Sequence, residues 1–322
     1  MLQSTFLDNL QKELPDGHSL NEAIATALDI SYDAAHRRTS LKSKFSLEEG
    51  ILLSKYFNLS LDKLFETTSE NYISVEKTKM VVDEESLKDY FLASYNSLKG
   101  LVQQKDSSVI YSAKDLPLFY TIGDDILSRF KMYVWLKLLD SGFDTLSFEQ
   151  YAPKTTTIEA SKALQKLYSD LNIVEIWDIT TINSTLKQIN FYFQAGLMNS
   201  DSALKICGNL KSLVHSVSKK VKSNRDNYQL YYNELLLMNN NVLIKTSTQK
   251  SLFVPFTVLS YYQTQDKLTC TQAESFLNKQ LQSSKLLNTA GEKEQRTFFN
   301  KIILKISALS QLIEASQTLD FE

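Results

Sequence analysis

The sequence is poor in the residues that form disulfide bridges, metal sites and tight turns. Its 322 residues include two cysteines, three histidines, eight glycines and four prolines. Two cysteines, Cys207 and Cys270, are too few for a disulfide framework or a zinc pattern. We expect each to be a small, buried, apolar residue in a reducing compartment. The scarcity of glycine and proline favours long helices with few tight turns.

The sequence also lacks a long hydrophobic run and an excess of one charge. Its least charged stretch, residues 251–265, is interrupted by Pro255, Thr257 and Ser260, so it cannot span a bilayer. The first residues lack the basic and apolar regions of a signal peptide. We therefore expect a cytoplasmic protein that does not bind membranes. Because the formal net charge is −2, any contact with nucleic acid must come from a local cationic patch.

Patterns of catalysis and cofactor binding are missing too. His18, His36 and His215 are far apart, and there is no glycine-rich phosphate loop, nucleophile elbow or His-Glu-x-x-His motif. We therefore predict no catalytic residue, no metal and no cofactor. An enzyme with an unrecognised C-terminal site is a less favoured alternative. Four aromatic-rich stretches fit core packing better than a ligand pocket; they are residues 119–120, 133–135, 191–193 and 231–232.

What the sequence does contain is a pair of short helices near its start. Ser19 and Glu22 predict a capping box that begins the first helix. Ala25 permits the close approach that two steeply crossing helices need. Asp29 tolerates the left-handed backbone expected in the turn, and Ser31 can cap the second helix. This arrangement predicts a helix-turn-helix, whose second helix enters the DNA major groove.

The second helix, at about residues 31–40, is expected to present a cationic outer face. No acid occurs between residues 34 and 47, whereas Arg37, Lys42 and Lys44 are basic. Arg37 has the planar fork that matches guanine O6 and N7, and the lysines suit the phosphate backbone. Arg38 could instead fold back against the domain. The predicted DNA-binding residues are Ser31, Tyr32, Asp33, His36, Arg37, Ser40, Lys42 and Lys44.

Residues 19–66 resemble the XRE (Cro/phage-repressor) type of helix-turn-helix. The resemblance lies in Leu28-Asp29-Ile30-Ser31-Tyr32-Asp33-Ala34-Ala35-His36-Arg37-Arg38, in Phe45-Ser46-Leu47-Glu48-Glu49, and in Asn58-Leu59-Ser60-Leu61-Asp62-Lys63-Leu64-Phe65. Leu41 departs from the pattern, because a glycine commonly ends the recognition helix, and Gly50 interrupts the next helix. Residues 111–120 and 292–301 are similar to the long partner domain of such proteins in Bacteroidetes-like bacteria, which implies no activity.

The predicted fold class is mainly α, in two domains. Residues 1–66 are expected to form a five-helix, lambda-repressor-like domain, in which Ser46 and Glu49 make a second capping box. Residues 67–83 are predicted to be a linker. Residues 84–322 are predicted to be mostly helical, with strands near 228–262 that include a hairpin of 228–238 and 242–247 around three asparagines.

Together these features predict a sequence-specific transcriptional regulator that binds double-stranded DNA as a homodimer. The C-terminal domain would dimerise the protein and could bind a small-molecule or peptide effector. The alternative is an interaction protein that senses a peptide or protein through a TPR-like helical superhelix; regular helix pairs after residue 84 would favour it.

Overall fold

The computed structural model describes residues 2–65, 71–104, 106–223, 226–235, 237 and 239–318. The chain divides into two units, Met1–Ser74 and Val75–Glu322, each of which is described by itself. Among these described residues, no helix has both the length and the apolar character needed to cross a membrane. Part of the predicted linker, residues 67–70, lies outside the described residues.

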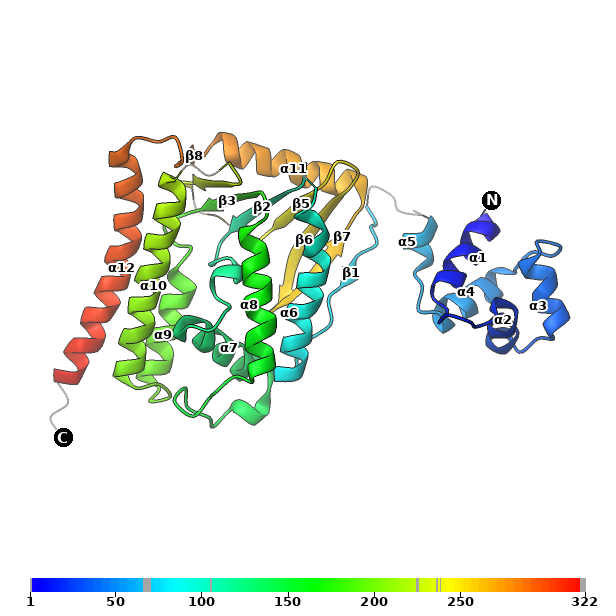
Figure 1. Ribbon diagram of the computed structural model, residues 1–322, viewed down its shortest axis with the longest axis horizontal. Coiled ribbons are helices and arrows are strands. Elements are labelled where there is room, and N and C mark those ends of the chain that lie inside the picture. The colour runs from blue at the N-terminus through cyan, green and yellow to red at the C-terminus, as the bar shows by residue number, and fades with distance from the viewer. Residues whose placement is uncertain are drawn as a thin grey trace. The chain divides into compact units, whose positions relative to one another are not determined.

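Unit 1 is a small bundle of helices around one apolar core (Figure 1). Its described helices are α1 (Leu2–Lys12), α2 (Leu20–Leu28), α3 (Tyr32–Thr39), α4 (Leu47–Tyr56) and α5 (Leu61–Phe65). The core is formed by Phe6, Leu7, Leu10, Ile24, Ala35, Leu53 and Phe57. Helices α1 to α4 each contribute buried apolar residues to this core, and α5 packs against it through partly buried side chains.

Local signals explain most helix ends in unit 1. The capping box of Ser46 and Glu49 is confirmed at the start of α4. The capping box predicted at Ser19 is wrong, because its side chain accepts no capping hydrogen bond. Asp29 adopts the expected left-handed conformation, with φ of 51°. Leu41 is also left-handed, with φ of 61°, so the chain keeps the turn that a glycine usually makes.

Unit 2 shows that the predicted fold class, mainly α with only a small hairpin or short sheet, is wrong. The unit is built on an eight-stranded mixed sheet of order β1-β7-β6-β5-β2-β3-β4-β8, so it has an α/β fold. Strands do occur near residues 228–262, as predicted, but the sequence did not predict the central strand at 173–177 or the extent of the sheet. That central strand is short and buried on both faces, which removes the polar/apolar alternation. The strands are β1 (Glu76–Lys77), β2 (Ser108–Ala113), β3 (Ile173–Trp177), β4 (Tyr228–Tyr232), β5 (Val242–Lys245), β6 (Lys250–Thr257), β7 (Ser260–Thr264) and β8 (Lys285–Leu286).

The predicted hairpin around the three asparagines is wrong as well. Strand β4 pairs in parallel with β3 and antiparallel with β8, whereas β5 pairs with β2 and β6. The two strands that flank the asparagines are therefore not neighbours, although Leu236 and Met238 of this predicted hairpin lie outside the described residues. The asparagines favoured a turn locally, but β4 instead pairs along its whole length with β3.

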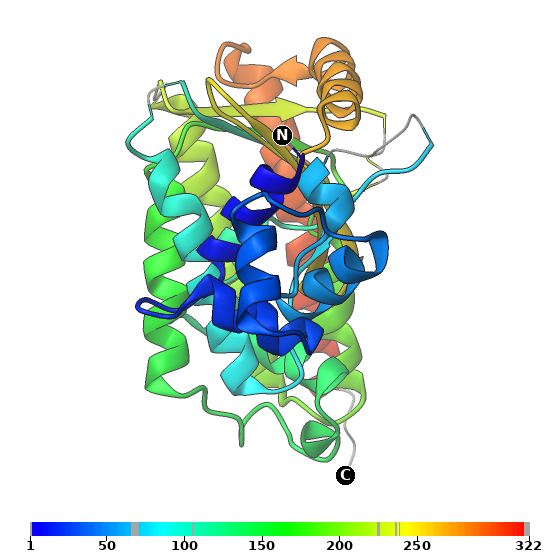
Figure 2. The same ribbon diagram turned by 90° about the vertical axis from the view of Figure 1, so that its right-hand side faces the viewer.

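Helices cover the two faces of the sheet unequally (Figures 1 and 2). Alternate residues of β2 show this, because Val109 and Tyr111 belong to the large core whereas Ile110 belongs to the smaller core with Leu277 of α11. The large core lies under α6 (Glu84–Leu98), α7 (Ile126–Leu139), α8 (Thr155–Ser169), α9 (Asn183–Gln194), α10 (Ser200–Lys222) and α12 (Glu292–Thr318), and the smaller one under α11 (Lys267–Gln282).

This layered arrangement bears on the superhelix alternative. Three parallel strands, β2, β3 and β4, are joined through α7 and α8 and then through α9 and α10. The helices thus serve as crossovers on a sheet, which differs from a stack of repeated helix pairs. Within the described part of unit 2 there is no stack of regular helix pairs, which is the arrangement that would have favoured a TPR-like superhelix.

Candidate nucleic-acid interface

The turn between α2 and α3 is closed by backbone hydrogen bonds. The Asp29 N–H donates to the Thr26 carbonyl oxygen over 3.4 Å, and the Ile30 N–H donates to the Ala25 carbonyl oxygen over 3.0 Å. With Asp29 left-handed, these bonds satisfy the last carbonyls of α2 and turn the chain sharply. Ala35 is fully buried at the crossing point, so α3 packs closely on the rest of unit 1.

Helix α3 is also held at both of its ends by hydrogen bonds. Ser31 caps it, because its hydroxyl accepts a hydrogen bond from the Ala34 N–H over 3.3 Å. Asn21 of α2 bridges the helix: its Nδ2 donates to the Tyr32 hydroxyl over 3.2 Å, and its Oδ1 accepts from the Thr39 hydroxyl over 2.6 Å. Sequence reasoning missed Asn21, because both partners are brought to it only by the folded turn.

All the predicted DNA-binding residues are exposed in unit 1, on α3 or on the segments beside it. Three of them make local bonds through their side chains: Ser31 caps α3, Tyr32 accepts a hydrogen bond from Asn21, and the Ser40 hydroxyl donates to the His36 carbonyl oxygen over 2.6 Å. Within the described part of the chain, the side chains of His36 and Arg37 have no hydrogen bond or ion pair to the protein. These two side chains therefore have polar groups available to an outside partner.

Arg38 folds back against unit 1 and does not belong to the exposed face of α3. Its guanidinium donates from Nε to Glu49 Oε2 over 3.1 Å and from Nη2 to Glu49 Oε1 over 2.5 Å. Its Nη1 also donates to the Ala34 carbonyl oxygen over 3.0 Å. The hydrogen bond from Arg38 lowers the pKa of Glu49 below its ordinary value. Arg38 thus joins α3 to α4 and is turned away from any partner of the exposed face.

The loop after α3, which carries Lys42 and Lys44, is anchored by a residue from the start of the chain. Gln3 of α1 donates from Nε2 to the carbonyl oxygens of Arg38, over 2.9 Å, and Ser43, over 2.8 Å. Its Oε1 accepts a hydrogen bond from the Phe45 N–H over 3.3 Å. Both lysines stay exposed on this fixed loop. The sequence carried no signal for Gln3, because its partners are distant along the chain.

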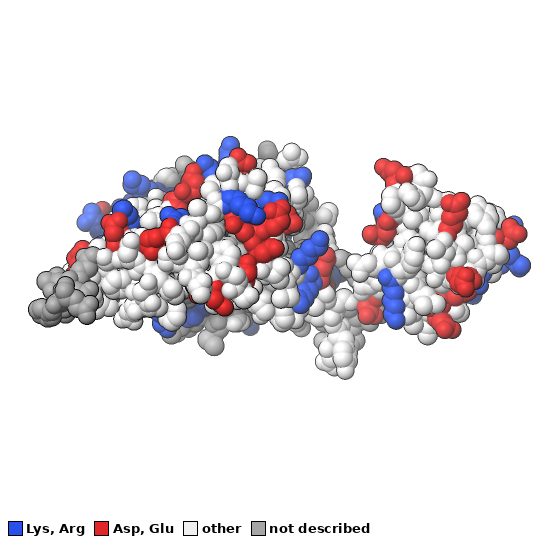
Figure 3. Space-filling model, turned by 90° about the horizontal axis from the view of Figure 1, so that it is seen from below, with Lys and Arg blue, Asp and Glu red and all other residues white. Residues whose placement is uncertain are grey.

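The other candidate features of the sequence lie in unit 2. Cys207 and Cys270 are free and buried, as predicted. Most residues of the aromatic-rich stretches are buried or partly buried, whereas Phe191 is 62% exposed. No cluster of histidine, cysteine and carboxylate residues suited to a metal occurs among the described residues. On the face of unit 2 that Figure 3 presents, acidic and basic side chains are interspersed.

No protein-family model, curated protein or solved structure matches the chain. The resemblance to the XRE type of regulator therefore stays a prediction, which depends on the residues of the turn and of α3.

Proposed function

We propose that unit 1 binds double-stranded DNA sequence-specifically and that the chain is a transcriptional regulator. Helix α3 enters the major groove, and Arg37 recognises a guanine through its O6 and N7 atoms. Two observations together support this most strongly. The side chains of His36 and Arg37 are exposed and make no hydrogen bond within the described part of the protein. The helix that carries them is held in place by Ala35, Asn21 and Ser31. A rigid element with free donors is what base recognition requires.

The remaining predicted residues have supporting roles in this proposal. Lys42 and Lys44, on the loop fixed by Gln3, contact phosphates, and each should contribute about one unit to the salt dependence of binding. Tyr32 and the N-terminal N–H groups of α3 suit a phosphate at the other end of the helix. Asp33 accepts a hydrogen bond from a cytosine amino group.

The proposal includes a homodimer in the cytoplasm, where the DNA target lies. One copy of unit 1 buries little DNA surface, so specific binding is expected to need two copies. Two copies of unit 1 related by a twofold axis would bind half-sites about 34 Å apart, which is one turn of DNA. Unit 2 would provide the dimer contact and has no catalytic role in this proposal.

Selection of DNA from a random pool with the full-length protein tests the proposal. We expect a consensus with two inverted half-sites whose centres are about 10 base pairs apart. A single half-site in the selected pool would contradict the dimer but keep the DNA-binding activity. Recovery of sequences without any enrichment, at a salt concentration near the physiological value, would contradict sequence-specific binding itself.

A further inference from the structure

A cavity lies in unit 2 between α6 and the strands β2, β5, β6 and β7 (Figure 1), and we call it the α6 cavity. Its volume is about 620 Å³, which lies within the range of small-molecule pockets. All of its walls belong to unit 2. The chemistry of its lining therefore decides which kind of molecule it could bind.

The floor of the α6 cavity is a part of the sheet that stays partly uncovered. The strand register places Val242 of β5 beside Tyr111 of β2 and beside Phe253 of β6. It also places Phe253 beside Gln263 of β7. Because directly opposite residues share one face of a sheet, these side chains form one row across four strands, about 14 Å long. Tyr111 is buried, whereas Val242, Phe253 and Gln263 are partly exposed, so these three offer surface to a ligand.

Short side chains on α6 leave the space above this floor. The helix lines the cavity with residues that are three or four positions apart and so share one helical face: Ser86, Asp89, Tyr90, Ala93, Ser94 and Ser97. Most of them are serine or alanine, which reach only a short way toward the sheet. The larger Leu87 and Phe91 of α6 are buried in the large core instead.

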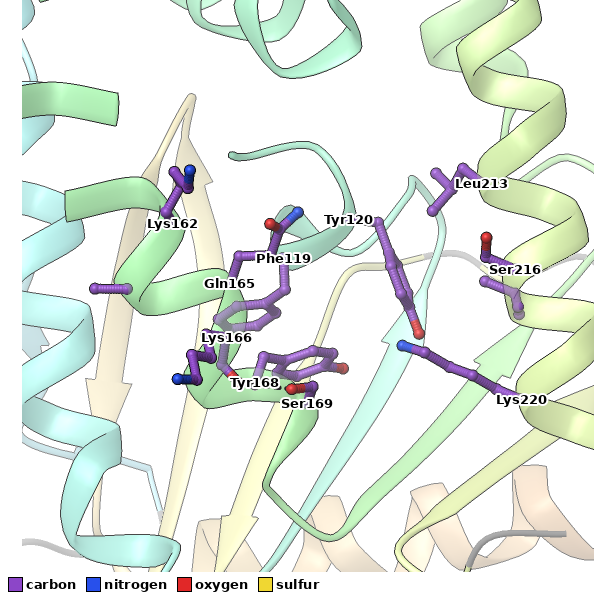
Figure 4. Close-up of a pocket in the computed structure, with 12 residues that line it drawn as sticks. Phe119, Tyr120, Lys162, Gln165, Lys166, Tyr168, Ser169, Leu213, Ser216 and Lys220 are labelled. Atoms are coloured by element: carbon purple, nitrogen blue, oxygen red, sulfur yellow. Dashed lines mark hydrogen bonds between the residues drawn. The ribbon is translucent and has the colours of Figure 1, made fainter. Parts of the chain in front are cut away.

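The rest of the lining is mostly apolar. Leu118, Phe119 and Ile244 line the cavity and are partly exposed, so they add apolar surface for a ligand. The ring of Phe119 is stacked on that of Tyr168, with centroids 3.8 Å apart and planes at 5°. Both rings also line the neighbouring cavity that Figure 4 shows.

The cavity of Figure 4 is less suited to a ligand, because groups in its lining are engaged within the protein. Lys162 pairs with Asp124 over 2.6 Å. The Nζ of Lys220 lies 5.1 Å from the centroid of the Tyr120 ring, and Tyr120 is buried. The α6 cavity is therefore the stronger candidate.

The charged residues that line the α6 cavity balance one another. Glu76 and Asp89 are acidic, Lys77 and Lys79 are basic, and all four are exposed. The partly exposed floor residues Val242, Phe253 and Gln263 carry no charge. The lining thus favours neither an anion nor a cation.

Gln263 supplies a hydrogen-bonding group to the floor. The hydroxyl of Tyr90 interacts with Ser94, and those of Tyr111 and Tyr261 interact with each other. By contrast, the side-chain amide of Gln263 has no hydrogen bond or ion pair to the part of the chain that the structure describes. An amide both donates and accepts, so it suits a neutral polar group.

We propose that the α6 cavity binds an uncharged, mainly aliphatic small molecule with one hydroxyl or carbonyl group. Its hydrocarbon part packs on Val242, Ile244 and Phe253, and the burial of this part supplies most of the affinity. Its polar group bonds the Gln263 amide. A charged molecule of the same length would leave its charge unpaired on the floor. This inference is independent of the proposed DNA binding, because it concerns unit 2 alone and its test contains no DNA.

Isothermal titration of the full-length protein with neutral alcohols tests the inference. The probes are 1-hexanol, 1-octanol and 1-decanol, with octanoate and octylammonium as charged analogues of 1-octanol. We expect one site per chain and an affinity that rises about fourfold for each added methylene group. Both charged analogues should bind about tenfold or more weakly than 1-octanol. The inference is overturned when no alcohol binds below about 1 mM, or when either charged analogue binds as tightly as 1-octanol.

Variants of α6 locate the site. Ala93→Trp, at an exposed lining position, should fill the cavity and abolish the binding of 1-octanol. Leu92→Trp is the matched control, because Leu92 is exposed on the same helix but does not line the cavity. Ser97→Trp, one turn farther along the lining face, should also block binding, which guards against an Ala93→Trp variant that fails to fold.

Gln263→Met removes the amide, keeps a side chain of similar length and should weaken 1-octanol about two- to tenfold. An unchanged affinity in this variant would contradict the polar contact. Equal affinities in the wild type, Ala93→Trp and Ser97→Trp would place the ligand elsewhere and contradict the inference. An equal loss in Leu92→Trp and Ala93→Trp would reduce the effect to a general disturbance of α6 and would also contradict it.

Discussion

Replacing Arg38 by alanine should destabilise unit 1 and leave the sequence preference for DNA unchanged. The guanidinium donates two hydrogen bonds to Glu49 and one to the Ala34 carbonyl oxygen, which together join α3 to α4. Glu49 would keep its bond from the Ser46 N–H, so Arg38→Ala leaves the cap of α4 in place. The change therefore isolates the contact between the two helices.

The size of the effect follows from how far the pair is shielded from water. The side chains of Arg38 and Glu49 are each 20% exposed. A fully exposed ion pair contributes about 0.2–1 kcal/mol, and a hydrogen bond to a charged group contributes about 1.5–3 kcal/mol. A partly shielded, two-point contact lies between these values, so we expect a loss of about 2 kcal/mol for Arg38→Ala.

Calorimetry of the full-length protein measures this loss. For a domain of this size, 1 kcal/mol shifts Tm by about 4–8 °C, so the transition of unit 1 should fall by about 8–16 °C. Glu49→Gln and the double variant complete a cycle whose coupling energy reports the pair alone. Lys55→Ala, an exposed cation on α4, is the control and should leave Tm within about 2 °C.

The pH dependence of the coupling adds a second check. Because the folded pKa of Glu49 is lowered, the stabilisation is fully present above the unfolded pKa of the carboxyl group. It is lost as the pH falls through the lowered, folded pKa. An unchanged Tm in Arg38→Ala, together with weaker DNA binding, would refute the reasoning and would assign Arg38 to the DNA.

Three further changes test other parts of the structure. Leu41→Gly should stabilise unit 1 by about 0.5–1 kcal/mol in urea denaturation, because glycine adopts the left-handed conformation without strain; a loss would contradict this. Gln3→Ala should cost about 1–2 kcal/mol and speed amide exchange in the loop at 41–45; unchanged exchange would show that the loop does not depend on Gln3. Glu175→Gln should gain stability relative to the wild type as the pH rises from the ordinary glutamate pKa through the raised, folded value, because the wild type must then bury a charge. A difference in stability that stays constant with pH would contradict the burial of a titrating carboxyl group.

In unit 1, the features that the sequence predicted are local ones. The Ser46 and Glu49 capping box depends on residues three apart, and the left-handed turn depends on Asp29 itself. Gln3 and Asn21 were missed because their partners lie far along the chain and meet them only after folding. DNA binding by α3 stays a prediction, which the exposure of Arg37 supports without testing it.

In unit 2 the sequence predicted strands near residues 228–262, where β4, β5, β6 and β7 lie, but it did not predict β3. Strand β3 contains Glu175 between apolar neighbours, a pattern that gives neither helical nor strand alternation. Its carboxyl group is tolerated in the core because tyrosines from α8 and β4 donate to it. Single-sequence patterns carry no information on such distant partners, so β3 and the order in which the strands pair could be found only in the structure.

The affinity of the Arg37→Ala variant for the selected DNA tests the central claim most directly. Lys12→Ala is the matched control. Lys12 lies on α1, about 13 Å along the helix axis from Gln3, and Gln3 is the α1 residue that contacts the loop after α3. Fluorescence anisotropy should show a loss of about 1–3 kcal/mol for Arg37→Ala with relaxed preference at one base pair, and no change for Lys12→Ala. Equal affinities in the wild type and both variants would contradict recognition of DNA by α3.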